Sequence, residues 1–255
     1  MVNKLNNKIN KLSHHILHHE FEKASDILYF AELDEKNNIM DVIENFIKCG
    51  KNAIFEFFMY LHVVERKNLV SKFFPEVFTK LLSNQEVRIK NKYYNSLQLK
   101  LGTASDSGDH LAYGSDPTFS SSLPYPDRFL WVLKFELESD GENYFRIVNK
   151  YYNSLQLKLG TDSDSGDHLA YGSDPTFSFS LPYPDRFLWK LVLDSNDEDN
   201  NGASRVYFRI VNKYYDSLQL KLGTASDSGD HLTYGSDPTF SSSLPYPDRF
   251  LWSIE

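Results

Sequence analysis

The stretch SDSGDHLAYGSDPTF at Ser105–Phe119 decides the fold, because the chain contains it three times. It returns unchanged at residues 163–177 and as SDSGDHLTYGSDPTF at residues 226–240. Extended outward, the repeat becomes a 41-residue unit that aligns without a gap at Asn91–Trp131, Asn149–Trp189 and Asn212–Trp252. A unit of this size cannot bury its own apolar face, so the three copies are expected to share one core.

Each copy has the pattern of β structure. SLQLKLG at Ser96–Gly102 alternates leucines with polar residues, which is typical of a half-buried strand. YFRIVN at Tyr144–Asn149 and FLWVLKFEL at Phe129–Leu137 predict further strands, and SGD and LPYPD mark turns between them. The length variation lies between the copies, where surface loops are free to grow.

Three units of roughly four strands predict a C-terminal β-trefoil domain over residues 85–255, with repeats at about 86–134, 135–192 and 193–255. In this prediction a six-stranded barrel is capped by three hairpins. Closing the sheet removes the exposed strand edges that would otherwise invite aggregation.

Residues 1–84 predict a separate all-helical domain. Leu5, Ile9, Leu12 and Ile16 recur at the spacing of one helical face. Gly50 is expected to end a third helix, and Pro75 to lie in the first turn of the last one. The predicted fold is therefore α+β and multidomain, with five or six short helices forming a bundle before the β-trefoil.

Charge and composition exclude several classes of function. The net charge is −8, and residues 1–84 hold 11 basic against 11 acidic side chains, so the acidic excess lies in the repeats. An acidic surface repels phosphate backbones, which argues against nucleic acid as a partner.

The single cysteine, Cys49, forms no internal disulfide, and the most apolar stretch, Ala53–Val64, is too short for a transmembrane segment.

Four stretches resemble insect low-molecular-weight (30 kilodalton) lipoproteins, the microvitellogenin-like family. They are NLVSKFFPEVFTKLLSNQEVRIKN at Asn68–Asn91, VYFRIVNKYYDSLQLKLG at Val206–Gly223, GDHLAYG at Gly108–Gly114 and the terminal FLWSIE. The resemblance spans nearly the whole chain and is strongest from about residue 66 onward. It implies a helical domain followed by a β-trefoil, an abundant extracellular protein, and binding of sugars or lipids rather than catalysis.

The repeated turn DSGDHLAYG supplies the candidate carbohydrate site. A carboxylate accepts hydrogen bonds from sugar hydroxyls, an aromatic ring contacts the apolar face of a pyranose, and an imidazole donates or accepts. The predicted carbohydrate-binding residues are Asp109, His110, Tyr113, Asp167, His168, Tyr171, Asp230, His231 and Tyr234. The alternative is structural: the aspartate caps the turn, the histidine braces it and the tyrosine packs on the barrel.

A second candidate surface is the SLPYPDRFLW segment. Its prolines fix an extended turn that can present a tyrosine as a rigid contact, which makes Tyr125, Tyr183 and Tyr246 secondary binding candidates. Its aspartate and arginine can equally form a local ion pair. Its tryptophans Trp131, Trp189 and Trp252 are expected in the core.

The stretch HHILHHE places His14, His15, His18 and His19 on a helix, with two pairs at the i,i+4 spacing that can chelate Zn²⁺. We interpret these histidines as the polar flank of an amphipathic helix and predict no metal ligands and no cofactor. The nucleophile, phosphate-loop and dinucleotide motifs of enzymes are missing from the sequence, so no enzyme is predicted.

The leading function hypothesis is a non-catalytic binding protein whose trefoil presents up to three equivalent sites to glycans or glucans. The alternatives are a lipid carrier or storage protein, with the ligand in the phenylalanine-rich helical domain, and a protein-interaction scaffold. The family resemblance implies secretion. The start MVNKLNNKIN lacks the apolar run of a signal peptide, so either a leader was removed or the protein is cytoplasmic.

Overall fold

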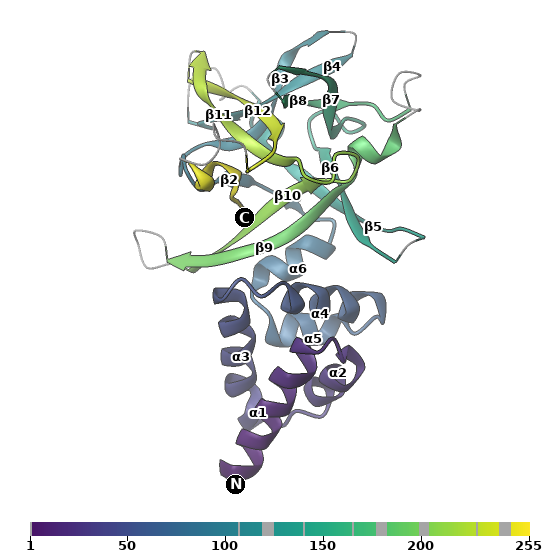
Figure 1. Ribbon diagram of the computed structural model, residues 1–255, viewed down its shortest axis with the longest axis vertical. Coiled ribbons are helices and arrows are strands. Elements are labelled where there is room, and N and C mark those ends of the chain that lie inside the picture. Colours follow the sequence, from purple (N-terminus) through teal and green to yellow (C-terminus); the bar gives the residue numbers. More distant parts are fainter. Residues whose placement is uncertain are drawn as a thin grey trace. The chain divides into compact units, whose positions relative to one another are not determined.

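The computed structural model describes residues 2–106, 108–118, 125–139, 141–164, 166–176, 183–198, 204–227, 229–239 and 246–255 (Figure 1). The chain forms two compact units. The first contains Met1–Ser83 together with Leu193–Val206, and the second contains Asn84–Val192 together with Tyr207–Glu255.

The described part of the first unit is built mainly from helices, drawn in purple and blue in Figure 1. They are α1 (Val2–Leu17), α2 (Phe21–Tyr29), the 3₁₀ turn η1 (Leu33–Glu35), α3 (Lys36–Lys48), α4 (Asn52–Val63), α5 (Lys67–Phe73) and α6 (Glu76–Leu82). None of the described helices combines the length and the apolar character needed to cross a membrane.

Phenylalanine rings fill the core of the helical unit. Phe57 and Phe58 of α4 are fully buried, and the Phe58 ring lies edge-on to Phe78 of α6 with ring centroids 4.9 Å apart. The amphipathic period of α1 buries Leu12 and Ile16 against the same core, as the sequence predicts. The aromatic content of this unit is thus largely explained by ring-to-ring packing.

The helix ends follow the chemistry of the sequence. Gly50 takes the left-handed conformation (φ 58°) and donates its N–H to Ile47 O, while the Lys51 N–H bonds to Phe46 O. These two bonds form a Schellman motif, which confirms the predicted end of α3 at Gly50. Pro75 is the N-cap of α6 and so lies one residue before the helix rather than within its first turn.

The second unit consists of strands with short 3₁₀ turns, and two of these strands, β9 (Trp189–Glu198) and β10 (Ser204–Asn212), extend into the Leu193–Val206 segment of the first unit. Among the described residues the strands are β1 (Glu86–Val87), β2 (Ile89–Asn91), β3 (Gln98–Asp106), β4 (Asp109–Ser115), β5 (Trp131–Leu137), β6 (Asn143–Asn149), β7 (Gln156–Asp164), β8 (Asp167–Ser173), β9 (Trp189–Glu198), β10 (Ser204–Asn212), β11 (Gln219–Asp227), β12 (Asp230–Ser236) and β13 (Trp252–Ile254). The 3₁₀ turns are η2 (Pro126–Phe129), η3 (Pro184–Phe187) and η4 (Pro247–Phe250).

The three repeats form the same hairpin in the same register. Strands β3 and β4, β7 and β8, and β11 and β12 pair so that Leu99 faces Gly114, Leu157 faces Gly172 and Leu220 faces Gly235. Strands β4, β8 and β12 then each pair with the other two. As a result the thirteen strands belong to one antiparallel sheet, in which teal, green and yellow segments interleave (Figure 1).

The β-trefoil prediction is wrong. The structure has N-terminal helices followed by a closed antiparallel β-barrel with extra strands, and not a six-stranded barrel capped by three separate hairpins. The hairpin strands β4, β8 and β12 are hydrogen-bonded to one another across the repeats and belong to the same sheet as the other strands. The repeat in the sequence indicates that three units share a core, but it does not indicate the backbone hydrogen bonds between strands of different repeats.

Glycine makes the close approach of the hairpins possible. A Cβ atom on Gly172 would lie only 2.8 Å from Cδ2 of Leu101, which belongs to another repeat. A Cβ atom on Gly235 would clash with Leu159 in the same way, and one on Gly114 would clash with Leu222. Leu101, Leu159 and Leu222 are fully buried, so each repeat inserts one leucine over a bare glycine backbone of another.

The tryptophans lie in the core, as predicted. Trp131, Trp189 and Trp252 are fully buried. Each indole N–H donates to a backbone carbonyl of its own repeat at 2.8–2.9 Å, accepted by Leu99, Leu157 and Leu220. The buried polar atom of each ring is therefore satisfied.

The leucine-over-glycine contact gives the first prediction. We expect Gly172→Ala to lower the free energy of unfolding by about 1–3 kcal/mol, because the added methyl group overpacks against Leu101. Leu101→Ala alone should cost about 2–5 kcal/mol by leaving a cavity. The double variant should cost less than the sum of the two single variants, measured by denaturant unfolding. Strict additivity would show that the two residues do not compete for the same space.

Candidate functional site

The aspartates of the predicted carbohydrate site form ion pairs between repeats. The Lys158 ammonium lies 2.8 Å from the Asp109 carboxylate, which also accepts a hydrogen bond from the Ser173 hydroxyl. Lys221 and Ser236 hold Asp167 in the same way, with the Lys221 nitrogen at 2.6 Å. Lys100, at 2.8 Å, and Ser115 hold Asp230 and close the cycle. Each repeat thus binds the aspartate of another.

The lysines of these pairs are almost completely buried. The side chains of Lys100, Lys158 and Lys221 are only 3–7% exposed, whereas the aspartates remain about one-third exposed. Burial lowers the pKa of Lys100 and of Lys221, and the paired aspartate partly offsets this effect. An ammonium in this position needs its carboxylate partner.

The histidine and the tyrosine of the repeated turn contact other neighbours. His110 Nδ1 bonds to Gly102 O at 2.9 Å, and its ring lies 4.2 Å from the ring of Tyr152 in the next repeat. Because a carbonyl oxygen only accepts, Nδ1 carries the proton. Tyr113 lies against its own hairpin, where a Cβ on Gly102 would be 2.9 Å from Cε2 of the ring.

The other two repeats copy this arrangement. His168 stacks on Tyr215 with ring centroids 4.3 Å apart, and His231 on Tyr94 at 4.5 Å. Tyr171 and Tyr234 lie against Gly160 and Gly223. The structure therefore directs each predicted Asp, His and Tyr toward a different neighbour, and the aspartates pair with lysines of other repeats. Carbohydrate binding by these nine residues stays a prediction.

The secondary candidates have a different environment, because they are exposed and paired. Tyr125, Tyr183 and Tyr246 are 40–41% exposed, and each lies edge-on to a second exposed tyrosine with ring centroids 5.6–5.7 Å apart. The resulting tyrosine pairs are Tyr125 with Tyr151, Tyr183 with Tyr214, and Tyr246 with Tyr93. The sequence indicates only one member of each pair.

Each tyrosine pair is the outer part of a larger aromatic cluster. Tyr151 also packs edge-on against Tyr152 at 4.7 Å, and Tyr152 in turn stacks on His110. On the other side, the guanidinium of the buried Arg128 lies 5.2 Å from the Tyr125 ring centroid. Rings that are held from both sides lose little further freedom on binding a ligand, which favours recognition.

One buried asparagine in each repeat positions its tyrosine pair. The side-chain oxygen of Asn149 accepts the N–H groups of Tyr151 and Tyr152 at 3.1 and 3.3 Å. Its side-chain nitrogen donates at 2.9 Å to Arg128 O in η2, the 3₁₀ turn that follows Tyr125. Asn149 is completely buried and so joins the two segments that carry the pair.

Asn91 and Asn212 have the same role in the other repeats. The side-chain nitrogen of Asn91 donates to Arg249 O at 3.0 Å, and that of Asn212 to Arg186 O at 2.9 Å. Their side-chain oxygens accept the N–H groups of Tyr93 and Tyr214. These asparagines were not predicted from the sequence, although each is the first residue of the 41-residue unit. A buried Asn before a two-tyrosine turn is the pattern that could have indicated them.

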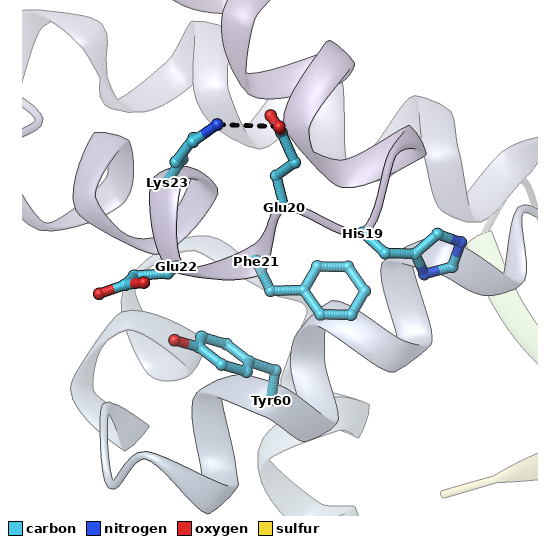
Figure 2. Close-up of a pocket in the computed structure, with 6 residues that line it drawn as sticks. All are labelled: His19, Glu20, Phe21, Glu22, Lys23 and Tyr60. Atoms are coloured by element: carbon cyan, nitrogen blue, oxygen red, sulfur yellow. Dashed lines mark hydrogen bonds and ion pairs between the residues drawn. The ribbon is translucent and has the colours of Figure 1, made fainter.

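The helical unit contains an open pocket of about 440 Å³ beside α2. It is lined by His19, Glu20, Phe21, Glu22, Lys23 and Tyr60. Figure 2 shows the rings of Phe21 and Tyr60 close to each other and the ion pair between Lys23 and Glu20, whose atoms are 2.8 Å apart. The hydrogen bond from Lys23, together with that from His15, lowers the pKa of the Glu20 carboxyl to about 2.

The buried hydrogen bonds of Asn149 give a second prediction. Asn149→Ala should lower the free energy of unfolding by about 3 kcal/mol, because it leaves buried backbone groups without partners. Asn153→Ala, in the same turn but exposed, should change it by less than about 0.5 kcal/mol. Tryptophan fluorescence during denaturant unfolding measures both. Equal effects of the two variants would contradict a bracing role for Asn149.

Comparisons with known proteins match nearly the whole chain. Residues 6–254 match the family described as lepidopteran low molecular weight (30 kD) lipoprotein. Microvitellogenin of Manduca sexta is 33% identical over 220 residues, which cover 85% of this chain and 78% of that protein. Low molecular mass lipoprotein PBMHPC-23 of Bombyx mori is 27% identical over 250 residues, or 96% of this chain and 86% of that one.

Among solved structures, a mosquitocidal holotoxin aligns with a TM-score of 0.44 and 21% identity, over 68% of this chain and 17% of the toxin. The family match and the sequence relatives cover both the helical unit and the barrel, in agreement with the resemblance noted from the sequence. The chain belongs to the lepidopteran low molecular weight (30 kD) lipoprotein family.

Proposed function

We propose that this protein is an extracellular, non-catalytic binding protein whose barrel binds repeating glycans through its three tyrosine pairs. The observation that carries the proposal is the threefold presence of the same exposed, edge-to-face pair. Each pair offers a ring face to the apolar side of a pyranose and two hydroxyls for hydrogen bonds.

The preorganisation of the pairs supports the proposal. Tyr125 and Tyr151 are about 40% exposed although their neighbours Tyr152 and Arg128 are partly or fully buried. A stable fold gains little by leaving two large rings half in water at the same position in all three repeats. A ligand surface explains both the exposure and the rigid support.

Three equivalent sites favour polymeric ligands. A shallow pair of rings contacts only one or two sugar units, so affinity for a monosaccharide is expected to be weak. A repeating glycan that engages two or three pairs at once can gain about 10²–10⁴ in avidity without any new contact.

The third prediction tests this function. The triple variant Tyr125→Ala, Tyr183→Ala, Tyr246→Ala should lose at least about 10²-fold in binding to insoluble glucan, because it breaks all three pairs. The measurement is co-sedimentation of the full-length protein with the polymer. Tyr29→Ala, which removes a 59% exposed tyrosine of the helical unit, is the matched control and should bind as the unmodified chain does.

Folding of the triple variant is checked by the unfolding midpoint, which exposed tyrosines should change little. Unchanged polymer binding in a folded triple variant would contradict the proposal. Absence of binding by the unmodified chain to every glucan and glycan polymer in a panel would also contradict it.

A lipid ligand in the helical unit is the second candidate, and the name of the family is consistent with it. The observation that favours it is a run of exposed apolar side chains at the end of α2 and in η1. Tyr29 is 59%, Phe30 70% and Leu33 85% exposed. Mass spectrometry of an organic extract of the purified chain tests this candidate, and an extract without stoichiometric lipid would count against it.

A further inference from the structure

The end of α1 brings three potential metal ligands together. His14, His15 and Glu20 each offer one ligand atom, and these atoms all lie within 4.8 Å of one another. His15 Nδ1 is in hydrogen-bond contact with a Glu20 carboxylate oxygen. The His14 ring lies 5.6 Å from that of His15 and 4.2 Å from that of His18.

The backbone explains why Glu20 returns to the helix that precedes it. The Glu20 N–H bonds to His15 O at 2.8 Å, and the His19 N–H bonds to Ile16 O at 3.2 Å. These two bonds form a Schellman motif with His19 at the left-handed position (φ 55°). Glycine is the common choice there, and histidine is one of the few other residues that adopt positive φ.

The position of the cluster suits a metal that exchanges with solvent. The side chains of His15 and Glu20 are 17% and 35% exposed, and His14 is exposed. The three groups therefore form a partly buried site that solvent can reach. Imidazole nitrogen and carboxylate oxygen are both ligands of Zn²⁺. We propose that His14, His15 and Glu20 form a surface zinc-binding site in the helical unit.

Tetrahedral coordination of zinc by these three residues requires only changes in side-chain rotamers. Zinc bonds of about 2.0–2.2 Å in a tetrahedral site place ligand atoms roughly 3.3 Å apart. Rotation of the three side chains closes the remaining distance, and the zinc replaces the direct contact between His15 and Glu20. Water fills the fourth position, or His18 does after a change of rotamer. Lys23, which bonds to Glu20 Oε1 at 2.8 Å, leaves the other carboxylate oxygen for the metal.

The site is independent of the proposed function. It uses neither the tyrosine pairs nor the barrel, so failure of one proposal leaves the other standing. The ligand expected at this site is a divalent metal ion that prefers nitrogen ligands.

The fourth prediction is that the full-length chain binds one Zn²⁺. Isothermal titration with Zn²⁺ should show a saturable site of one ion per chain. His15→Ala and Glu20→Gln should each weaken binding at least about tenfold. Co²⁺ gives an independent readout, because a low-coordinate site with nitrogen and oxygen ligands produces visible absorption bands that should vanish in both variants.

The matched control is His19→Asn, which removes a neighbouring imidazole but keeps a residue that tolerates the left-handed conformation. It should bind Zn²⁺ within about twofold of the unmodified chain. No saturable binding by the unmodified chain would overturn the proposal. Equal weakening by the His19 control and the ligand variants would also overturn it, because it would indicate diffuse binding to surface histidines.

Discussion

Each repeat of the barrel places one aspartate against the buried lysine of another repeat, and the rest of the barrel depends on this exchange. The pairs Lys158–Asp109, Lys221–Asp167 and Lys100–Asp230 close into a cycle. A lysine ammonium that is nearly inaccessible to water is costly to bury without a carboxylate. In all three pairs the carboxylate comes from a different repeat than the lysine, so one copy alone would leave its buried ammonium without this carboxylate. The cycle needs all three copies.

The same exchange explains why the hairpins merge into a single closed sheet. The aspartates begin β4, β8 and β12, which are the strands that pair with one another across the repeats. On the apolar side, the contact between a leucine of one repeat and a glycine of another allows these strands to approach closely. On the polar side, the ion pair between lysine and aspartate holds them together. Specific polar contacts of this kind select one arrangement among several that would bury similar apolar area.

This arrangement leaves a surface that carries the proposed function. The aspartates and histidines are engaged between repeats, whereas the paired tyrosines are 40–45% exposed. Asn149 and its equivalents hold these pairs by joining the two-tyrosine turn to the 3₁₀ turn η2 or its copies. The aspartates and histidines of the repeated turn contact other repeats, whereas Tyr125 and its equivalents, together with tyrosine partners that the sequence did not indicate, are exposed to solvent.

Part of the fold could be predicted from the sequence, although the β-trefoil prediction was wrong because the strands pair across the repeats in one sheet. Periodicity indicated the helices and the strand SLQLKLG, the glycine at position 50 indicated the end of α3, and the three tryptophans were correctly placed in the core. The burial of Lys100 was not predictable, because strict alternation placed it on a polar face of a half-buried strand. Near-identical repeats also hide which copy contacts which. Asp230 pairs with a lysine 130 residues away, and the same motif stands at every alternative position.

A double-mutant cycle on Asp167 and Lys221 tests the central claim most directly. The measurement is the free energy of unfolding from tryptophan fluorescence, which reports on the barrel because the chain's three tryptophans all lie in it. We predict that Asp167→Ala costs about 3 kcal/mol, since it leaves the Lys221 ammonium buried and unpaired. Adding Lys221→Met should recover at least about 1 kcal/mol of that loss relative to the sum of the two single variants. Additive effects within about 0.5 kcal/mol would contradict the account, because they would show that the repeats are not held together by this pair.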